Sequence, residues 1–302
     1  MSQARTFSTG YDRSRLHNYL ALLRHHRRNR KAIPRYDFDR FQQAREVFER
    51  YGHTQVRDST ILEIGCGQRF TATLLFHSLG AKAVGIDMDQ VTPNFSLGAF
   101  RAIWRQNGFE RALKTLVRFL LFDAQFYRDL SKAFGEPLRK ANVDLRVMDA
   151  RAMQFPDASF DYIYSLSVFE HIDDIDRATR ETARVLKPGG IAYIGVHLFP
   201  CLSGGHHFEW SNPDQRPSRR VPPWDHLRQN LYPSQAYLNK LREPDYIETF
   251  RKYLTIIDVR SKYEGEGLLT DSIRQELANY SRDDLLKSSI FVVMTRKPDR
   301  PT

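Results

Sequence analysis

Short, mostly apolar runs alternate along this chain with segments of helical periodicity, and this alternation restricts the fold more than any other feature. The first run, residues 59–65, ends in glycine and is typical of a buried parallel strand. Six further strand candidates lie at residues 83–87, 145–148, 162–165, 191–196, 254–260 and 290–295. Strands that alternate with helices form a parallel sheet through right-handed crossovers. The pattern predicts an α/β, Rossmann-like fold: a seven-stranded, mostly parallel sheet with helices on both faces.

Helical periodicity marks the segments between these strands and before the first of them. The expected helices are residues 14–29, 38–52, 71–78 and 176–186. Pro34 separates the first two, and Gly52 stops the second. The last one ends at a Lys-Pro-Gly-Gly turn, residues 187–190, directly before the fifth strand.

Two stretches are longer than simple connections between strands and helices require. Residues 94–142 have near-helical spacing of apolar side chains, whereas residues 197–250 begin with an irregular, Pro- and His-rich segment and become helical from about Ser234. We therefore expect an N-terminal helical extension, residues 1–52. One domain, residues 53–302, then carries the two insertions.

The composition excludes several classes of protein. The only cysteines are Cys66 and Cys201, too few for a disulfide framework or a zinc cluster of cysteines. No apolar run approaches the roughly 20 residues that a membrane-spanning helix needs. The N-terminus also lacks the apolar core of a signal peptide. We expect a cytoplasmic protein, and a homo-oligomer is compatible with the sequence.

The formal net charge of +10 is concentrated near the N-terminus. Residues 1–50 contain twelve Lys and Arg against five Asp and Glu, with the densest basic tract at residues 24–31. Such a tract is able to bind nucleic acid, an anionic lipid surface or an acidic substrate. No aromatic residue interrupts it as a base-stacking platform would require. The interpretation we favour is a solvated helix face, with no nucleic-acid partner.

A glycine turn after the first strand indicates a ligand site. Gly65 and Gly67 allow a tight turn and a close approach by a ligand. Asp87 follows Gly65 by 22 positions at the end of the second strand, where a carboxylate accepts hydrogen bonds from ribose hydroxyls. A dinucleotide is disfavoured, because the third glycine of the pyrophosphate fingerprint is missing and because Glu63 would repel a pyrophosphate. The same carboxylate favours a cationic ligand.

Four motifs in this order resemble one family. They are ILEIGCG, AVGIDMD, VMDARAMQFPDASFDYIYSLSVFEHI and ETARVLKPGGIAYIG, which together cover residues 59–196. The set is similar to the class I S-adenosylmethionine-dependent methyltransferases, of the small-molecule type related to quinone-biosynthesis enzymes. The resemblance implies a bound S-adenosylmethionine. Arg69 stands where many relatives carry a third glycine.

The resemblance also assigns residues to parts of this cofactor. Glu63, Gly65, Cys66 and Gly67 would lie at its methionine end, and Asp87 would bind the ribose. Met88 would pack on the adenine. Asp149 and Ala150 would contact the edge of the adenine. Ser165 and Leu166 would close the site from the end of the fourth strand.

The loop after the fifth strand should face the transferred methyl group, because ligands bind beyond the carboxyl ends of parallel strands. A hydroxyl acceptor needs a base, and histidine is a usual one. His206 and His207 follow a Gly204–Gly205 hinge, and His171 is a further candidate beside Glu170. We expect no metal, since no strict metal signature occurs. The alternative ligands in the loop are His197, His206, His207, Glu209 and Asp225.

The sequence therefore predicts an O-methyltransferase acting on a small molecule or a glycan. Trp210 and Trp224 in the same loop are candidates to stack on a sugar ring. One alternative is a nucleic-acid methyltransferase that uses the basic N-terminus. Another is a non-catalytic module that binds the cofactor.

Overall fold

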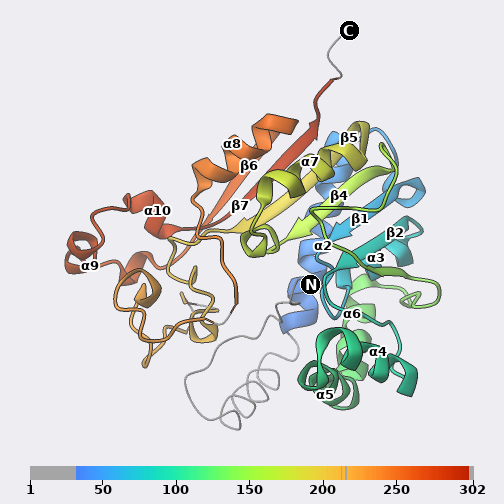
Figure 1. Ribbon diagram of the computed structural model, residues 1–302, viewed down its shortest axis with the longest axis horizontal. Coiled ribbons are helices and arrows are strands. Elements are labelled where there is room, and N and C mark those ends of the chain that lie inside the picture. Colours follow the sequence, from blue (N-terminus) through green and yellow to red (C-terminus); the bar gives the residue numbers. More distant parts are fainter. Residues whose placement is uncertain (1–31, 212, 215, 235, 299–302) are drawn as a thin grey trace.

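The computed structural model describes residues 32–298 apart from 212, 215 and 235, and these form a seven-stranded sheet with helices on both faces (Figure 1). The strand order is β3-β2-β1-β4-β5-β7-β6. All pairings among β1 to β5 are parallel, whereas β7 runs antiparallel to β5 and to β6. The predicted Rossmann-like, mostly parallel sheet is confirmed. The strands are β1 Thr60–Ile64, β2 Lys82–Asp87, β3 Asp144–Val147, β4 Phe160–Leu166, β5 Leu186–His197, β6 Leu254–Tyr263 and β7 Lys287–Arg296.

The start of β5 differs from the prediction. The Lys-Pro-Gly-Gly segment, expected as a turn before the strand, lies inside it. The partner of Phe160 is Leu186, but the partner of Tyr162 is Ile191, so extra residues of β5 bulge out of the pairing with β4. Gly189 has φ +74°, a left-handed backbone that suits glycine in such a bulge.

Helices cover both faces of the sheet because successive strand residues point to opposite sides. On one face, α2 Ala32–Tyr51, α3 Thr71–Leu79 and α6 Ala124–Phe134 pack on side chains such as Ile61 and Tyr162. On the other, α7 Ile175–Val185 and α8 Glu243–Tyr253 pack on their neighbours in sequence, Leu62 and Ile163.

Helix α2 belongs to the core of this domain, although the sequence assigns it to an N-terminal extension. Phe41 and Phe48 are buried between α2 and the sheet. The ring of Phe48 stacks on that of Tyr162 with centroids 4.5 Å apart. The helix predicted for residues 14–29 and the basic tract lie outside the described residues.

The first insertion is helical, as predicted. It consists of α4 Leu97–Asn107, α5 Phe109–Arg118 and a π-helical turn, Phe119–Asp123, that continues into α6. The second insertion, predicted as residues 197–250, contains short 3₁₀ turns before α8, among them Phe208–Trp210 and Asp225–Leu227. Both insertions follow the carboxyl ends of parallel strands and lie in the lower half of Figure 1.

The helix expected from about Ser234 is wrong in its start, because α8 begins at Glu243. The side chain of Asn239 donates hydrogen bonds to the carbonyls of Phe169 and Ile172, at 2.8 and 3.1 Å, and these hold its segment against the end of β4. The helix begins only after Arg242, whose backbone N–H donates a hydrogen bond to the carboxylate of Asp245 at 2.8 Å.

The chain ends with two short helices, α9 Asp271–Glu276 and α10 Arg282–Leu286, before β7. They pack with the second insertion in a separate apolar cluster, away from the two main faces of the sheet. Across the described part of the chain, no helix combines the length and the apolar character that crossing a membrane requires.

Candidate active site

The glycine turn after β1 has the geometry that the sequence predicts. Gly65 and Gly67 have φ +73° and +63°, in the left-handed region that disfavours side chains. A Cβ on Gly65 would lie 2.2 Å from Cγ2 of Val168, so packing also requires glycine there. A Cβ on Gly67 would meet nothing within 4 Å. The turn is therefore packed against the end of β4 on one side and open on the other.

Asp87 at the end of β2 is fixed by the backbone of this turn. One carboxylate oxygen accepts a hydrogen bond from the N–H of Gly67 at 2.8 Å, and the other accepts one from the N–H of Asp89 at 2.9 Å. Burial raises the pKa of Asp87, and the two backbone donors counteract part of that effect. The carboxylate thus has one fixed orientation beside the glycine turn.

Glu63 is a buried residue of β1 whose carboxyl lies at the start of α3. It accepts a hydrogen bond from the backbone N–H of Thr73 at 2.6 Å and a second one from the Thr73 hydroxyl. The first of these satisfies an N–H that the first turn of a helix leaves without a partner. Burial, with smaller contributions from the nearby Asp37 and Asp87, raises the pKa of Glu63 to about 8, although the two hydrogen bonds from Thr73 lower it. A cation beside this carboxyl would lower its pKa again.

A cavity of about 410 Å³ lies between the glycine turn and α2. This volume is within the range of about 300–1,000 Å³ of small-molecule sites. Five of the predicted cofactor residues line the cavity, namely Glu63, Gly65, Cys66, Gly67 and Leu166. Its wall also contains residues that the sequence reasoning did not identify, above all Asp37, Arg40, Arg69 and Arg118.

The unpredicted residues come from elements distant in sequence. Asp37 and Arg40 lie on α2, next to the core residues Phe38 and Phe41. Burial raises the pKa of Asp37 to about 6, although Arg69 nearby lowers it. The helical spacing identifies the core face of α2, but only the fold shows that its neighbouring polar residues reach the glycine turn.

Arg69 explains how the turn tolerates the loss of the third glycine. Its guanidinium leaves the turn and lies over the ring of Phe126 in α6, 4.2 Å from the ring centroid. Its Nε also lies 3.7 Å from a carboxylate oxygen of Asp123. The side chain therefore fills space between the turn and α6.

Five other predicted cofactor residues do not line this cavity. Asp87 lies beside the turn, Met88 is 48% exposed, and Ala150 is buried beyond β3. Asp149 forms an ion pair with Arg151 at 2.7 Å. Ser165 is fully buried and donates its hydroxyl to the carbonyl of Ile64 at 3.0 Å. The side chain of Ser165 therefore links β4 to β1.

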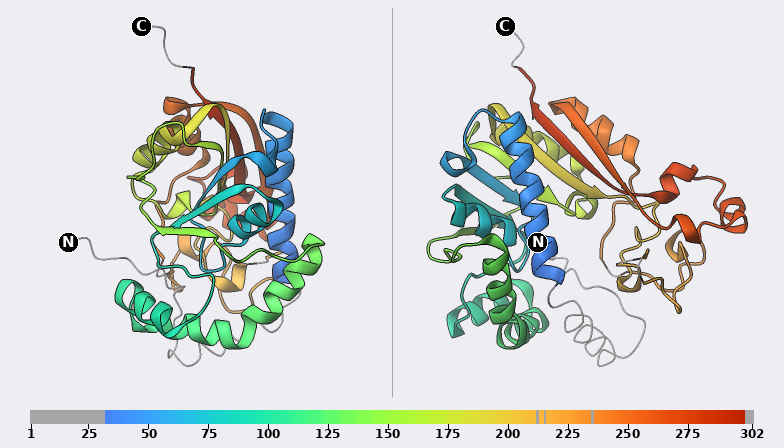
Figure 2. Two further views of the ribbon diagram at one scale, coloured as in Figure 1. Left: turned by 90° about the vertical axis from the view of Figure 1, so that its right-hand side faces the viewer. Right: turned by 180° about the vertical axis from the view of Figure 1, so that it is seen from behind.

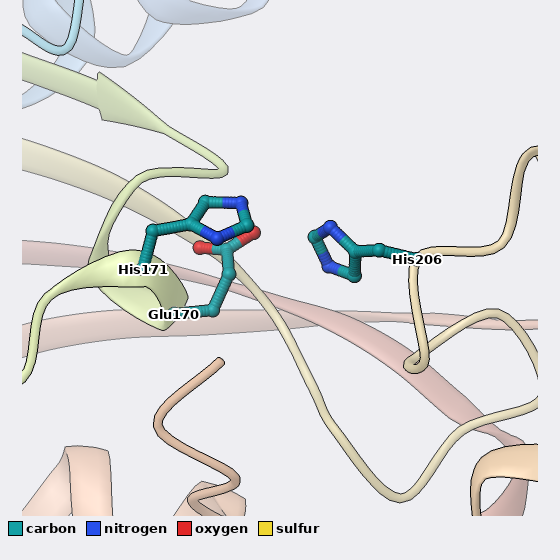
Figure 3. A group of neighbouring side chains, drawn as sticks. All are labelled: Glu170, His171 and His206. Carbon is teal, nitrogen blue, oxygen red and sulfur yellow. The ribbon is translucent and has the colours of Figure 1, made fainter. Parts of the chain in front are cut away.

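Three histidines gather beyond the ends of β4 and β5. His171 closes a 3₁₀ turn, Phe169–His171, and His197 ends β5. The ring of His206, from the second insertion, lies 4.9 Å from each of theirs by centroid, at nearly right angles. Burial lowers the pKa of His206 to about 2 and that of His197 to about 4. Figure 3 shows His206 across from His171 and its neighbour Glu170.

His207 does not join this cluster. Its Nδ1 accepts a hydrogen bond from the N–H of Glu209 at 3.2 Å, and its ring packs on Phe208 and Tyr232. The Gly204–Gly205 pair before it, predicted as a hinge, is closely packed. A Cβ on Gly204 would lie 2.1 Å from the carbonyl oxygen of Phe199, so this glycine is required by close packing.

The predicted stacking role of the tryptophans is contradicted. Trp210 and Trp224 are buried in the small cluster with α9 and α10. The indole N–H of Trp224 donates to the carbonyl of Leu285 at 3.2 Å. These rings stabilise the second insertion and are not available to a ligand.

The alternative ligand set of the sequence is not assembled either. Glu209 pairs with Arg220 at 2.8 Å, and Asp225 accepts the backbone N–H groups of Leu231 and Tyr232. Within the described ranges, the side chains that do converge are Glu170, His171 and His206.

Comparison with known proteins identifies the family. A model described as "Methyltransferase domain" matches residues 116–194. The 27-O-demethylrifamycin SV methyltransferase of Amycolatopsis mediterranei is 43% identical over 63 residues, which are 20% of this chain and 23% of that protein. The 2-methyl-6-phytyl-1,4-hydroquinone methyltransferase of Synechocystis sp. is 36% identical over 76 residues, 25% of this chain and 19% of that protein.

The match to each of these two relatives thus spans less than a quarter of that relative's length. A third relative, a ubiquinone/menaquinone biosynthesis C-methyltransferase of Pseudoalteromonas translucida, is 45% identical over 49 residues, 16% of this chain and 20% of that protein. The strand order with an antiparallel β7, the glycine turn and the acidic residue after β2 agree with these matches. Residues 116–194 and the fold around them are those of the class I S-adenosylmethionine-dependent methyltransferases, a family whose methyl donor is S-adenosylmethionine.

Proposed function

We propose that this chain transfers a methyl group from S-adenosylmethionine to a hydroxyl of a small molecule. One observation carries the proposal: the cavity at the glycine turn and the histidine cluster adjoin through one short segment. Leu166 lines the cavity, Val168 contacts Gly65, and Glu170 and His171 follow directly. A donor in the cavity and an acceptor at the cluster would therefore be neighbours.

The residues around the cavity fit the chemistry of this cofactor. Its ammonium and sulfonium groups are cationic, and Glu63 and Asp37 are carboxyls in the cavity wall. Arg40 and Arg118 are cations there that suit the carboxylate of its methionine part. The open side of Gly67 permits a close approach, with Asp87 beside it for the ribose. Met88 and Asp149 remain our proposed contacts to the adenine.

When bound, the cofactor supplies an electrophilic methyl group on a positively charged sulfur. The protein's own contribution is to orient an acceptor for in-line displacement, which is largely a matter of positioning. Burial keeps His206 and His171 neutral at physiological pH, the state in which an imidazole nitrogen accepts a hydrogen bond from a hydroxyl. We propose this pair, and not His207, as the groups that face the hydroxyl.

The choice of oxygen as the acceptor atom rests on two supports. The cluster consists of groups that accept a hydrogen bond from a hydroxyl. Among the relatives, the rifamycin enzyme is named for O-demethylrifamycin and another is named a ubiquinone biosynthesis O-methyltransferase. Since Trp210 and Trp224 are buried, the argument for a glycan is lost. We therefore propose a small-molecule hydroxyl.

The cofactor site is tested by calorimetry with S-adenosylmethionine. Replacing Asp87 by Ala removes hydrogen bonds to the ribose, each worth roughly 1.5–3 kcal/mol when charged, so the affinity should fall at least tenfold. Asp87→Asn keeps one acceptor and should retain part of the affinity. Asp271→Ala is the matched control, because that side chain is 94% exposed on α9. Unchanged affinity in folded Asp87→Ala would contradict the site.

The acceptor atom is tested with a donor that carries a ¹³C-labelled methyl group. Phenols, quinols and aliphatic alcohols are offered as acceptors, and the carbon chemical shift of the product distinguishes a methoxy group from a C-methyl or N-methyl group. Products labelled only on carbon or nitrogen would refute the O-methyl proposal. They would leave the cofactor site as proposed.

A further inference from the structure

We propose that Glu170, His171 and His206 bind one divalent transition-metal ion beside the cofactor cavity. Each residue offers one ligand atom, and these three atoms lie within 4.8 Å of one another. The side chains come from two segments, the turn after β4 and the second insertion, and they converge on one point (Figure 3). Two imidazoles and one carboxylate are a known donor set for zinc and for non-haem iron.

The carboxylate of Glu170 provides an independent reason. Its side chain is 3% exposed, and neither oxygen has a hydrogen-bond partner of normal geometry within the described residues. The nearest backbone donors are the N–H groups of Glu170 itself and His197, whose effect is smaller than that of burial. Burying a carboxylate is costly unless it is paired or ligates a metal. A cation between Glu170 and the two histidines satisfies this group.

The tautomer of His171 is suited to the same role. Its Nδ1 lies 2.8 Å from the carbonyl oxygen of Tyr237. A carbonyl only accepts, so Nδ1 carries the proton, and the lone pair of the neutral ring is on Nε2. Metal-binding histidines usually donate their other ring N–H in this way, which orients the ring and increases its basicity.

The loop that carries His206 is held in a strained conformation. His206 has φ +54°, a left-handed backbone that persists in a non-glycine residue only when its surroundings enforce it. The hydroxyl of Ser203 lies 3.0 Å from Nε2 of His197 and donates to Glu264 at 2.5 Å. These bonds fix the chain three residues before His206, and such strain is typical of ligand sites.

The donor set also indicates which ion binds. Imidazole nitrogen suits zinc, iron, copper and nickel, whereas magnesium and calcium prefer oxygen ligands. Three protein ligands leave coordination positions open for a further molecule. If the proposed methyl transfer is correct, that molecule is the acceptor hydroxyl, whose acidity the cation increases. His171 and His206 then orient the hydroxyl as ligands of the ion, and the proton that the hydroxyl loses passes to solvent water.

Metal binding is measured on the full chain without an affinity tag and after dialysis against a chelator. We expect one Zn²⁺ or Co²⁺ per chain by calorimetry and elemental analysis, with a Co²⁺ absorption spectrum typical of histidine ligation. Glu170→Gln, His171→Gln and His206→Gln should each lower the affinity at least tenfold, with folding checked by thermal denaturation. His207→Gln is the matched control, one residue along the same loop, and should bind as the wild type does.

The outcomes separate this site from the proposed function. No binding of Zn²⁺, Co²⁺, Mn²⁺ or Fe²⁺ by wild-type protein that binds S-adenosylmethionine would overturn the metal site and leave the cofactor site intact. Equal loss in His207→Gln and His206→Gln would overturn the ligand assignment. Stoichiometric metal binding that depends on the three residues supports the site, even in a protein that fails to bind S-adenosylmethionine.

Discussion

Glu63 shows how one buried carboxyl links pH to stability. Its pKa is raised to about 8 in the folded chain, so the folded state binds its proton more tightly than the unfolded state does. A raised carboxyl pKa stabilises the fold while the proton is bound, and this stabilisation is lost as the pH rises through the folded pKa. Because the pKa rises from 4.5 to about 8, the loss begins above pH 4.5 and is complete near pH 8.

We therefore predict that the cofactor-free protein loses stability between pH 6.5 and pH 8. At roughly 1.4 kcal/mol per pKa unit, Glu63 accounts for about 1–2 kcal/mol of the loss. Glu63→Gln, which does not ionise, should show a correspondingly smaller decrease in urea denaturation at the two pH values. An identical decrease in both proteins would mean that Glu63 is already ionised at pH 6.5.

Ser165 illustrates a residue whose role changes once its partner is known. The family resemblance assigns it to the cofactor, but its hydroxyl donates to Ile64 in the interior of the sheet. We predict that Ser165→Ala lowers the free energy of unfolding by about 1–3 kcal/mol, because it leaves a buried carbonyl without its donor. The affinity for S-adenosylmethionine, measured by calorimetry, should not change. A large loss of affinity without loss of stability would restore the original assignment.

At the scale of elements, local patterns were sufficient where one face of a strand or helix meets the core. The strands and the helices α2, α3 and α7 follow from apolar periodicity, which records burial directly. The pattern failed where tertiary contacts decide the conformation. Asn239 holds its segment extended by bonds to residues 169 and 172, about 70 positions away, and no local signal encodes such partners.

The candidate site was predictable in the same unequal way. Gly65, Gly67 and Asp87 have a characteristic spacing, and the structure brings them together. Asp37 and Glu170 have no such spacing, because their roles depend on segments that meet only in the fold. Tryptophan is a residue type that often contacts ligands, but Trp224 is buried in a core cluster.

The Gly204–Gly205 pair allows a test of the second insertion as a packed element. A Cβ on Gly204 would lie 2.1 Å from a backbone carbonyl, and backbone does not yield as a side-chain end does. We predict that Gly204→Ala lowers the free energy of unfolding by about 1–3 kcal/mol through overpacking. Gly267→Ala is the control, because a Cβ there meets nothing within 4 Å. Equal stabilities of the two variants in urea denaturation would indicate that residues 204–205 are a hinge.

For the whole molecule, the fold brings distant parts of the chain to one edge of the sheet. The helical insertion and the irregular insertion both lie on the side of the sheet where β1, β4 and β5 end (Figure 2). The cofactor cavity and the cluster of Glu170, His171 and His206 both lie at this edge. The proposed donor site and the proposed acceptor site thus share one scaffold without sharing residues.

Helix α2 forms one wall of the cavity with Asp37 and Arg40, although it precedes the glycine turn and packs on the sheet as an independent segment. A ligand in the cavity therefore contacts both sides of that packing interface and opposes its opening. Amide hydrogens of α2 should exchange with solvent deuterium more slowly when the cofactor is bound, whereas those of α9, in the separate cluster, should exchange at an unchanged rate. The bound cofactor would then hold α2 against the sheet.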